Sequence, residues 1–140
     1  MLTYNRLEDT IRSIESIYNY TKLPFELIIF DNASSDTRMK KYLNNLEKAK
    51  NNVKIIFNQS NLGCSGGRKR AIEFASGEYI ITLDSDISVT ENWLENLLIR
   101  IDSDESIAAA CAKVVFPDGK IQYNGGEYKI ENGFIRFSLV

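Results

Sequence analysis

Residues 78–86 read Glu-Tyr-Ile-Ile-Thr-Leu-Asp-Ser-Asp, an apolar run that ends in two carboxylates, Asp84 and Asp86. A continuous apolar run is typical of a strand that is covered on both faces, as in parallel α/β sheets. In open α/β sheets, ligands bind beyond the carboxyl ends of the strands. The two acids come directly after the predicted strand, at this position. The stretch therefore predicts a buried strand at 78–83 that ends at a ligand-binding edge.

The two acids are spaced so that both side chains point to the same side of an extended backbone. Carboxylates placed this close repel each other unless a proton or a cation lies between them. A divalent cation held by one or two carboxylates and by substrate phosphates removes that repulsion. An alternative is an Asp-Ser-Asp turn at 84–86 that caps the following helix. Both interpretations stay open on this stretch alone.

The composition narrows the classes of protein to which this chain can belong. The 140 residues are 44% hydrophobic and 26% charged, which is typical of one globular domain with a sizeable core. The 17 basic and 19 acidic side chains give a net charge of -2, so no general affinity for nucleic acid is expected. The chain contains no histidine, which excludes Ser-His-Asp triads and His-ligated zinc.

Two cysteines, Cys64 and Cys111, stand far apart and outside any metal-binding spacing, as in a reduced cytosolic protein. The sequence lacks an apolar run long enough to cross a membrane and a signal-peptide core at its start. A single cytoplasmic domain over residues 1–140 is therefore expected, with membrane contact only in a longer parent protein.

Apolar periodicity along the rest of the chain alternates between helices and strands. Leu7, Ile11, Ile14 and Ile17, for example, recur at helical spacing. Such alternation implies right-handed βαβ units and a mainly parallel sheet flanked by helices, with a small antiparallel hairpin near the C-terminus. The expected helices are 6–19, 36–49, 68–75 and 91–101, the last with Thr90 as N-cap, and the expected strands are 25–30, 53–58, 78–83, 107–116, 121–123 and 128–130.

Negatively charged side chains and groups that attract anions are both expected at the carboxyl edge of the sheet. Asp31 and Asp84 each end a predicted strand, so both acids lie at the same edge if the strands are parallel. The backbone amides of residues 65–67, in a glycine-bearing turn, form a candidate anion site with Arg68. The alternatives are a helix-capping loop at 31–36 and a solvated face of the helix that carries the arginine.

Five segments, taken in order and with their spacing, resemble the family 2 glycosyltransferases, which are nucleotide-diphospho-sugar transferases of the GT-A fold. The segments are Thr3-Tyr4-Asn5-Arg6, Asp31-Asn32-Ala33-Ser34-Ser35-Asp36, Asn61-Leu62-Gly63 with Gly67-Arg68, Ala75-Ser76-Gly77-Glu78-Tyr79-Ile80, and Leu83-Asp84-Ser85-Asp86. A stretch at 116–122, followed by Gly125-Gly126, resembles rhamnosyltransferase-like members. The resemblance spans residues 3 to about 126 and implies a Rossmann-like α/β fold of the GT-A type.

The resemblance implies a role for each matched position. Thr3 and Asp31 hold the nucleoside, and Arg68 lies against the nucleotide. Asp84 contacts ribose or metal, and Asp86 binds the Mn²⁺ or Mg²⁺ that bridges the diphosphate. The nucleotide-binding residues are then Thr3, Tyr4, Asn5, Arg6, Asp31, Ser34, Asn61, Gly63, Arg68, Asp84 and Ser85. From local sequence alone, Asn5 is instead an N-cap candidate for the first helix.

Two parts of the family pattern are absent. The first strand is reduced to Met1-Leu2, and the later acidic motif Glu-Asp-x-Asp, which supplies the general base, does not occur after Gly126. The catalytic base is therefore unassigned. The sequence is interpreted as the nucleotide-sugar-binding portion of an enzyme, truncated at both ends.

The expected function is metal-dependent, inverting transfer of a sugar from a nucleoside-diphosphate sugar to a hydroxyl of a glycan, lipid or protein, although this chain is expected to bind donor only. One alternative is a sugar-phosphate nucleotidyltransferase, which needs a Gly-rich, basic loop that residues 3–6 do not supply. Another is a non-catalytic binding or assembly module of a polysaccharide-synthesis system. Unpaired sheet edges also favour self-association.

Overall fold

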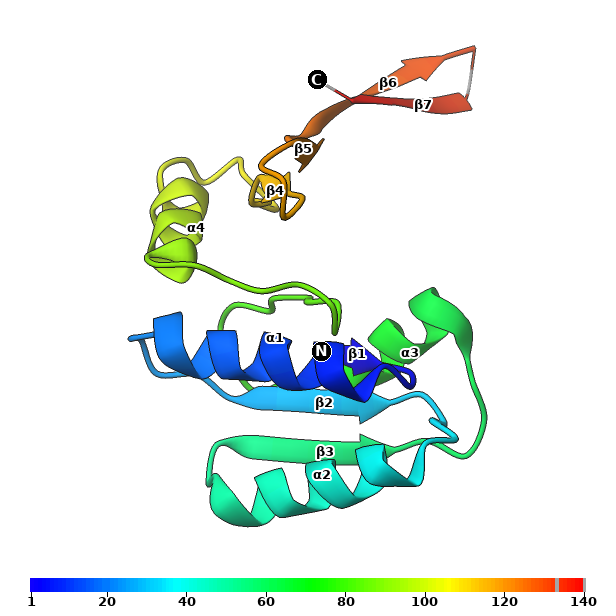
Figure 1. The fold of residues 1–140 in the computed structure, drawn as a ribbon. Helices are drawn as coiled ribbons and strands as arrows, with labels where there is room; N and C mark the ends of the chain where they lie inside the picture. Colours follow the sequence, from blue (N-terminus) through cyan, green and yellow to red (C-terminus); the bar gives the residue numbers. More distant parts are fainter. Residues whose placement is uncertain (133, 140) are drawn as a thin grey trace. The chain divides into compact units, whose positions relative to one another are not determined.

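The computed structural model describes residues 1–132 and 134–139 (Figure 1). The chain forms two compact units, residues 1–91 and residues 92–140. The first unit is a layered α/β structure, and the second contains one helix and short antiparallel strand pairs. That the whole chain acts as one domain stays a prediction.

A parallel sheet forms the centre of the first unit. Its three strands are β1 (Leu2–Thr3), β2 (Leu27–Asp31) and β3 (Val53–Phe57), in the order β1-β2-β3. Thr3 is paired with Asp31 and Asp31 with Phe57, so the three strands end together. The strands predicted from the periodicity at 25–30 and 53–58 are thereby confirmed, with bounds shifted by up to two residues.

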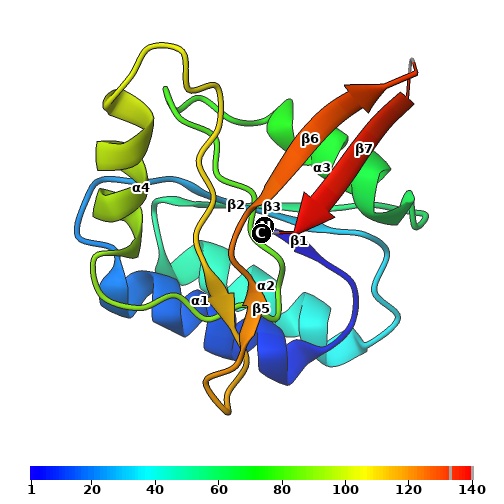
Figure 2. The ribbon, with the colours of Figure 1, turned by 90° about the horizontal axis from the view of Figure 1, so that it is seen from above.

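Helices cover both faces of this sheet. Figure 2 shows α1 (Leu7–Tyr20) and α2 (Thr37–Ala49) on one side and α3 (Gly63–Ile72) on the other. The apolar stripes of α1 and α2 pack on the sheet because burial of these side chains stabilises the fold. The mixed α/β architecture predicted from the sequence is confirmed. The core of the first unit includes Leu7, Ile14, Ile17, Leu27, Ile29, Phe30, Met39 and Leu43.

The strand predicted at 78–83 is wrong. One parallel bridge joins Leu2 to Asp84, and the Leu2 amide donates to the Leu83 carbonyl at 3.4 Å. The neighbouring strand β1 contains two residues, which offer too few backbone groups to pair a six-residue strand. Ile80 is consequently 52% exposed, although the apolar run had predicted burial on both faces.

The glycine-bearing turn at 61–67 is also corrected. Helix α3 begins at Gly63, five residues earlier than predicted, and its fifth residue, Gly67, is buried. A Cβ at Gly67 would lie 2.5 Å from Cδ1 of Leu2, so the missing side chain lets α3 lie close to β1. Packing therefore outweighs the low helix propensity of glycine at this position.

The second unit contains α4 (Trp93–Asp102), whose N-cap is Asn92 and not Thr90. The strand predicted at 107–116 shortens to β4 (Val114–Val115), which pairs antiparallel with β5 (Ile121–Tyr123) through a tight turn. The remaining strands β6 (Gly126–Glu131) and β7 (Phe134–Leu139) pair with each other. The antiparallel pairing near the C-terminus is confirmed, but the partners differ from those expected. Among the described residues, no helix is both long and apolar enough to cross a membrane.

Candidate functional site

The candidate site is a pocket at the carboxyl edge of the parallel sheet. It has a volume of about 230 Å³. β1 and the residues that directly follow it form one wall, and the turn that follows Leu83 forms the other. The structure thus brings together residues that are more than 80 positions apart in the sequence. The lining residues are Leu2, Thr3, Tyr4, Asp84, Ser85 and Asp86.

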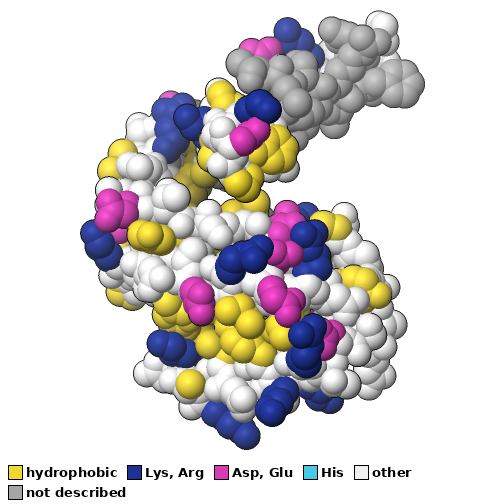
Figure 3. Space-filling view, viewed as in Figure 1, with side chains coloured by type: hydrophobic (Ala, Val, Ile, Leu, Met, Phe, Trp, Pro, Cys, Tyr) yellow, Lys and Arg dark blue, Asp and Glu magenta, His cyan; other side chains and the backbone are white. Residues whose placement is uncertain are grey.

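Each of the two pocket aspartates pairs with an arginine. Arg68, on α3, donates to Asp84, while Arg6 places Nη1 3.5 Å from Oδ2 of Asp86. The carboxylates remain accessible, with 53% of the Asp84 side chain and 46% of the Asp86 side chain exposed. Acidic and basic side chains also lie beside one another elsewhere on the face drawn in Figure 3. The pocket therefore presents two solvent-accessible carboxylates with basic partners.

Arg68 is the more deeply placed of the two arginines. Partial burial disfavours its charge, but the hydrogen bond and charge of Asp84 outweigh this effect and raise the pKa of Arg68 above its ordinary value. The buried Nε of Arg68 has no hydrogen-bond partner in the described structure. A buried donor of this kind usually has an acceptor, which a bound ligand can supply.

Thr3 and Asp31 lie side by side at the ends of β1 and β2 but are almost fully buried, with exposures of 1% and 4%. The Thr3 hydroxyl lies 3.1 Å from the Thr10 hydroxyl, and Asp31 accepts hydrogen bonds from the amide and hydroxyl of Ser34. Burial raises the pKa of Asp31, although the Ser34 hydrogen bonds oppose the change. Both side chains therefore have hydrogen-bond partners within the protein.

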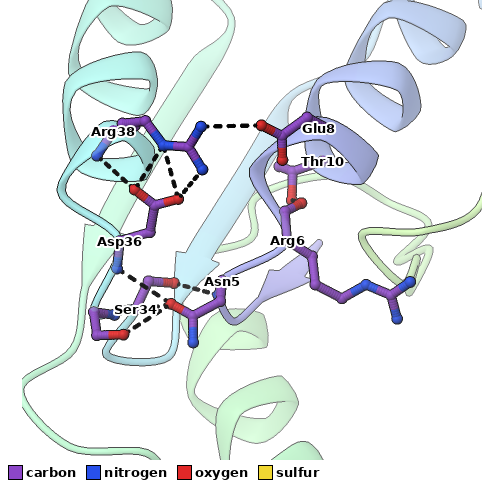
Figure 4. Close-up of polar contacts among 8 residues, drawn as sticks. Asn5, Arg6, Glu8, Thr10, Ser34, Asp36 and Arg38 are labelled. Carbon is purple, nitrogen blue, oxygen red and sulfur yellow. Dashed lines mark hydrogen bonds and ion pairs between the residues drawn. The ribbon is translucent and has the colours of Figure 1, made fainter.

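Asn5 joins the loop after β1 to the loop after β2 (Figure 4). Its amide N–H donates to Oγ of Ser34 at 2.7 Å, and its Oδ1 accepts from the amides of Ser35 at 3.0 Å and Asp36 at 3.2 Å. Asn5 is therefore not the N-cap of α1, a position that Arg6 occupies without a side-chain cap. Both residues have left-handed backbone, with φ of 56° and 55°.

The capping interpretation of residues 31–36 is confirmed in part. Asp36 is the N-cap of α2 and accepts from the Arg38 amide at 2.9 Å. The Arg38 guanidinium pairs with Asp36 and reaches Glu8 on α1, at 3.2 Å (Figure 4). Hydrogen bonds from Arg38 lower the pKa of Asp36. One loop thus caps a helix and also supports the neighbouring pocket wall.

Asn32 is a key residue that the sequence interpretation missed. Its side chain, in a residue that is 2% exposed, donates to Oδ1 of Asn61 at 2.9 Å and to the Gly63 carbonyl at 3.1 Å, and it accepts from the Leu62 amide at 2.9 Å. Its own amide donates to the Thr3 carbonyl at 2.9 Å. The predicted site residues Asn61 and Gly63 are thus anchored to the end of β2, beside the pocket. An asparagine directly after a predicted strand was the available signal.

The predicted anion site at 65–67 is only partly available. Gly66 and Gly67 lie beyond the first turn of α3, so their amides are intrahelical donors. The Gly63 amide donates to Oδ1 of Asn61 at 2.8 Å. Free amides at this helix start are therefore restricted to the first turn.

The donor chemistry of the pocket fits a divalent cation that a substrate helps to hold. Among the described residues, no group of three or more His, Cys, Asp or Glu side chains could hold a metal ion. Asp84 and Asp86 supply two hard oxygen ligands at the pocket, and phosphate oxygens and water complete such a site in many proteins. The pair therefore suits Mn²⁺ or Mg²⁺ bound together with a phosphate-bearing ligand.

The three-layer α/β unit with acids at the carboxyl edge of its sheet defines a protein of the GT-A fold class. The structure is similar to the crystal structure of S. aureus TarS 1-349, with a TM-score of 0.61 and 27% sequence identity over 74% of this chain and 31% of that one. The chain belongs to glycosyl transferase family 2, whose family description matches residues 1–138.

Two bacterial relatives show the extent of the similarity. The chain is 35% identical over 99 residues to the UDP-Glc:alpha-D-GlcNAc-diphosphoundecaprenol beta-1,3-glucosyltransferase WfgD of Escherichia coli, covering 70% of this chain and 36% of that protein. It is 32% identical over 97 residues to the GalNAc(5)-diNAcBac-PP-undecaprenol beta-1,3-glucosyltransferase of Campylobacter jejuni, covering 69% of this chain and 31% of the relative. The chain thus spans about a third of the length of these relatives.

Proposed function

We propose that this chain is the donor-binding part of a metal-dependent, inverting glycosyltransferase. The observation that carries the proposal is the pocket in which Asp84, Ser85 and Asp86 face Thr3 and Tyr4 at the carboxyl edge of the sheet. Family 2 membership supports a nucleoside-diphosphate sugar as the ligand. It also favours a glycosyltransferase over a sugar-phosphate nucleotidyltransferase.

Different residues of the site would bind the cation and the nucleotide. Asp84 and Asp86 would hold Mn²⁺ or Mg²⁺, which neutralises charge on the departing nucleoside diphosphate. Arg68, whose buried Nε lacks a hydrogen-bond partner in the part of the chain that the structure describes, would donate to the nucleotide. Asn5, Ser34 and the neighbouring loop keep the wall behind Thr3 in place. The general base of the reaction is assigned to no residue of this chain.

The relatives suggest the chemistry of donor and acceptor. WfgD is named for a UDP-Glc donor, and both it and the Campylobacter jejuni enzyme are named for glycans on diphosphoundecaprenol. We therefore propose a UDP-sugar donor and a lipid-linked glycan acceptor, in preference to a protein acceptor. The acceptor would meet parts of the whole enzyme that correspond to the uncovered length of these relatives.

Calorimetric titration of nucleotides tests the proposal. UDP, GDP and dTDP are titrated into the chain with and without Mn²⁺, and the series is repeated with Asp86→Ala and with Asp104→Ala, a control that removes an acid outside the pocket. The proposal predicts that UDP binds in a Mn²⁺-dependent manner to the wild-type chain and to the control, and that Asp86→Ala loses this binding. Equal binding of UDP to all three proteins, or binding without Mn²⁺, would contradict it.

A further inference from the structure

Arg6 lies between two carboxylates that belong to different parts of the first unit. Its Nε donates to Oδ2 of Asp9, on α1, at 2.7 Å, and its Nη1 lies 3.5 Å from Oδ2 of Asp86. The contact with Asp9 is therefore a close hydrogen bond, and the contact with Asp86 is a looser ion pair. One guanidinium serves both acids at once.

The backbone fixes where this guanidinium points. Arg6 has a left-handed backbone, which a non-glycine residue adopts only when its surroundings hold it there. The Arg6 carbonyl accepts from the amide and the hydroxyl of Thr10, at 3.0 Å and 3.1 Å, and Asn5 is fixed to Ser34 and Asp36. Figure 4 shows the Arg6 side chain pointing away from the cluster that contains Asn5 and Asp36. The strained loop thus directs Arg6 toward the pocket edge.

The two arginines of the pocket differ in how firmly they are held. The Arg6 side chain is 64% exposed, compared with 35% for Arg68. Exposed ion pairs contribute little free energy, so the pair with Asp86 is readily exchanged for a stronger partner. Arginine cannot shed its charge, and it must therefore move when a cation takes the carboxylate. When Arg6 leaves Asp86, its hydrogen bond to Asp9 keeps it in place.

We propose that Arg6 is a displaceable counter-ion of Asp86, an inference that rests on the proposed metal site. In the cation-free protein Arg6 neutralises Asp86, and a divalent cation that binds Asp86 displaces Arg6 onto Asp9. Arg6 competes with the cation and thereby sets the cation affinity of the pocket. Its role differs from that of Arg68, whose partner is Asp84.

Titration of Mn²⁺ alone into the full chain, followed by the loss of the electron paramagnetic resonance signal of free Mn²⁺, tests this role. Arg6→Gln is expected to bind Mn²⁺ about two- to fivefold more tightly than the wild-type chain, since an exposed competing pair is removed. Arg12→Gln is the matched control, because Arg12 also lies on the surface of this region and pairs with Asp9, whereas the ion pair of Asp86 is with Arg6. Its affinity is expected to stay within about 1.5-fold of wild type.

Two further variants separate the effect of the Arg6 charge on Mn²⁺ affinity from an effect of the substitution on folding. Arg6→Lys keeps the positive charge and is expected to stay within about twofold of wild type. Arg6→Gly removes the charge and tolerates the left-handed backbone, so it is expected to shift Mn²⁺ affinity in the same direction as Arg6→Gln. This variant decides the question if Arg6→Gln does not fold.

The outcomes distinguish this inference from the proposed function. Unchanged or weaker Mn²⁺ binding by the folded Arg6→Gln and Arg6→Gly variants, while Asp86→Ala loses Mn²⁺, overturns the counter-ion role and leaves the metal site standing. Equal Mn²⁺ binding by wild type and Asp86→Ala overturns both. Tighter binding in the two charge-removing variants, with Arg12→Gln unchanged, supports the competition.

Discussion

Arg68 on α3 forms an ion pair with Asp84, the first acid of the pocket turn, which is the turn at residues 84–86 that lines the pocket. The pair connects the helix on one face of the sheet to the turn at its carboxyl edge, and the backbone of Asp84 is bridged to Leu2 of β1. The buried Nε of the same guanidinium has no hydrogen-bond partner among the described residues. Arg68 is therefore held at the pocket by Asp84, and its Nε can still donate a hydrogen bond to a ligand.

Arg68→Gln is expected to weaken Mn²⁺-dependent UDP binding by roughly tenfold, because a charge-assisted donor is lost. Its free energy of unfolding is expected to fall by less than about 1 kcal/mol, since the pair is partly exposed to solvent. Calorimetry and chemical unfolding measure the two effects. Arg70→Gln, on the same helix and paired with Glu73, is the control. Similar losses of UDP binding in both variants would argue against a specific role for Arg68.

Asn32→Ala is expected to lower the free energy of unfolding by about 2 kcal/mol, because the buried Asn32 side chain loses its hydrogen bonds to Asn61, Leu62 and Gly63. Urea unfolding followed by circular dichroism measures the change. Asn45→Ala, at an exposed position of α2, is expected to change the value by less than about 0.5 kcal/mol. Equal effects would show that Asn32 does not anchor the loop.

Asn5 allows side-chain and backbone effects to be separated. Asn5→Ala and Asn5→Gly both lose the hydrogen bonds to Ser35 and Asp36, but only glycine adopts the left-handed backbone without strain. The glycine variant is therefore expected to be more stable than the alanine variant by about 1 kcal/mol. Equal stabilities in urea unfolding would mean that the left-handed conformation at Asn5 is not maintained in solution.

Glu26 makes the stability of the first unit depend on pH. Its Oε1 accepts from the Ser76 amide at 2.6 Å, the Ser76 hydroxyl at 3.0 Å and the Gly77 amide at 2.9 Å. The Ser76 amide is the largest cause that lowers the pKa of Glu26 below its ordinary value of 4.5. A lowered pKa in the folded state means that the ionised carboxylate stabilises the fold above pH 4.5 and that this contribution is lost as the pH falls through the folded-state pKa.

Glu26→Gln is therefore expected to be less stable than wild type at pH 7, by less than about 1 kcal/mol because the group is exposed. The difference is expected to shrink as the pH falls below 4.5. Urea unfolding at several pH values measures it, with Glu105→Gln, an exposed glutamate of the second unit, as control. A difference that is independent of pH would contradict the role of the ionised carboxylate.

The fold was predictable wherever the signal was local. Leu7, Ile14 and Ile17 recur at helical spacing and are buried in α1. The segment at 78–83 has equally strong strand character, but a strand also needs a partner, and β1 offers two residues. Likewise, the start of α3 was hidden by its glycines, of which Gly67 packs closely against Leu2. Tertiary contacts of this kind are not encoded in the periodicity of a segment.

The site was predictable where a motif lies directly after a predicted strand. The acids of the pocket turn and the residues after β1 were recognised together, and the structure brings Asp84 and Thr3 into one pocket. The long-range hydrogen bonds were not predicted, because they depend on side-chain directions across 29 or more residues, as between Asn32 and Asn61. The pairing of Arg6 with Asp86 is of the same type.

Nuclear magnetic resonance of the ¹⁵N-labelled chain with UDP and a small amount of Mn²⁺ tests the donor site most directly. The paramagnetic ion is expected to broaden the amide signals of Tyr4 and Ser85 first, and those of residues 46–49, at the end of α2 on the opposite sheet edge, least. In Asp86→Ala this pattern is expected to disappear. Selective broadening away from the pocket, or the same pattern in Asp86→Ala, would contradict a cation and nucleotide site at Asp84 and Asp86.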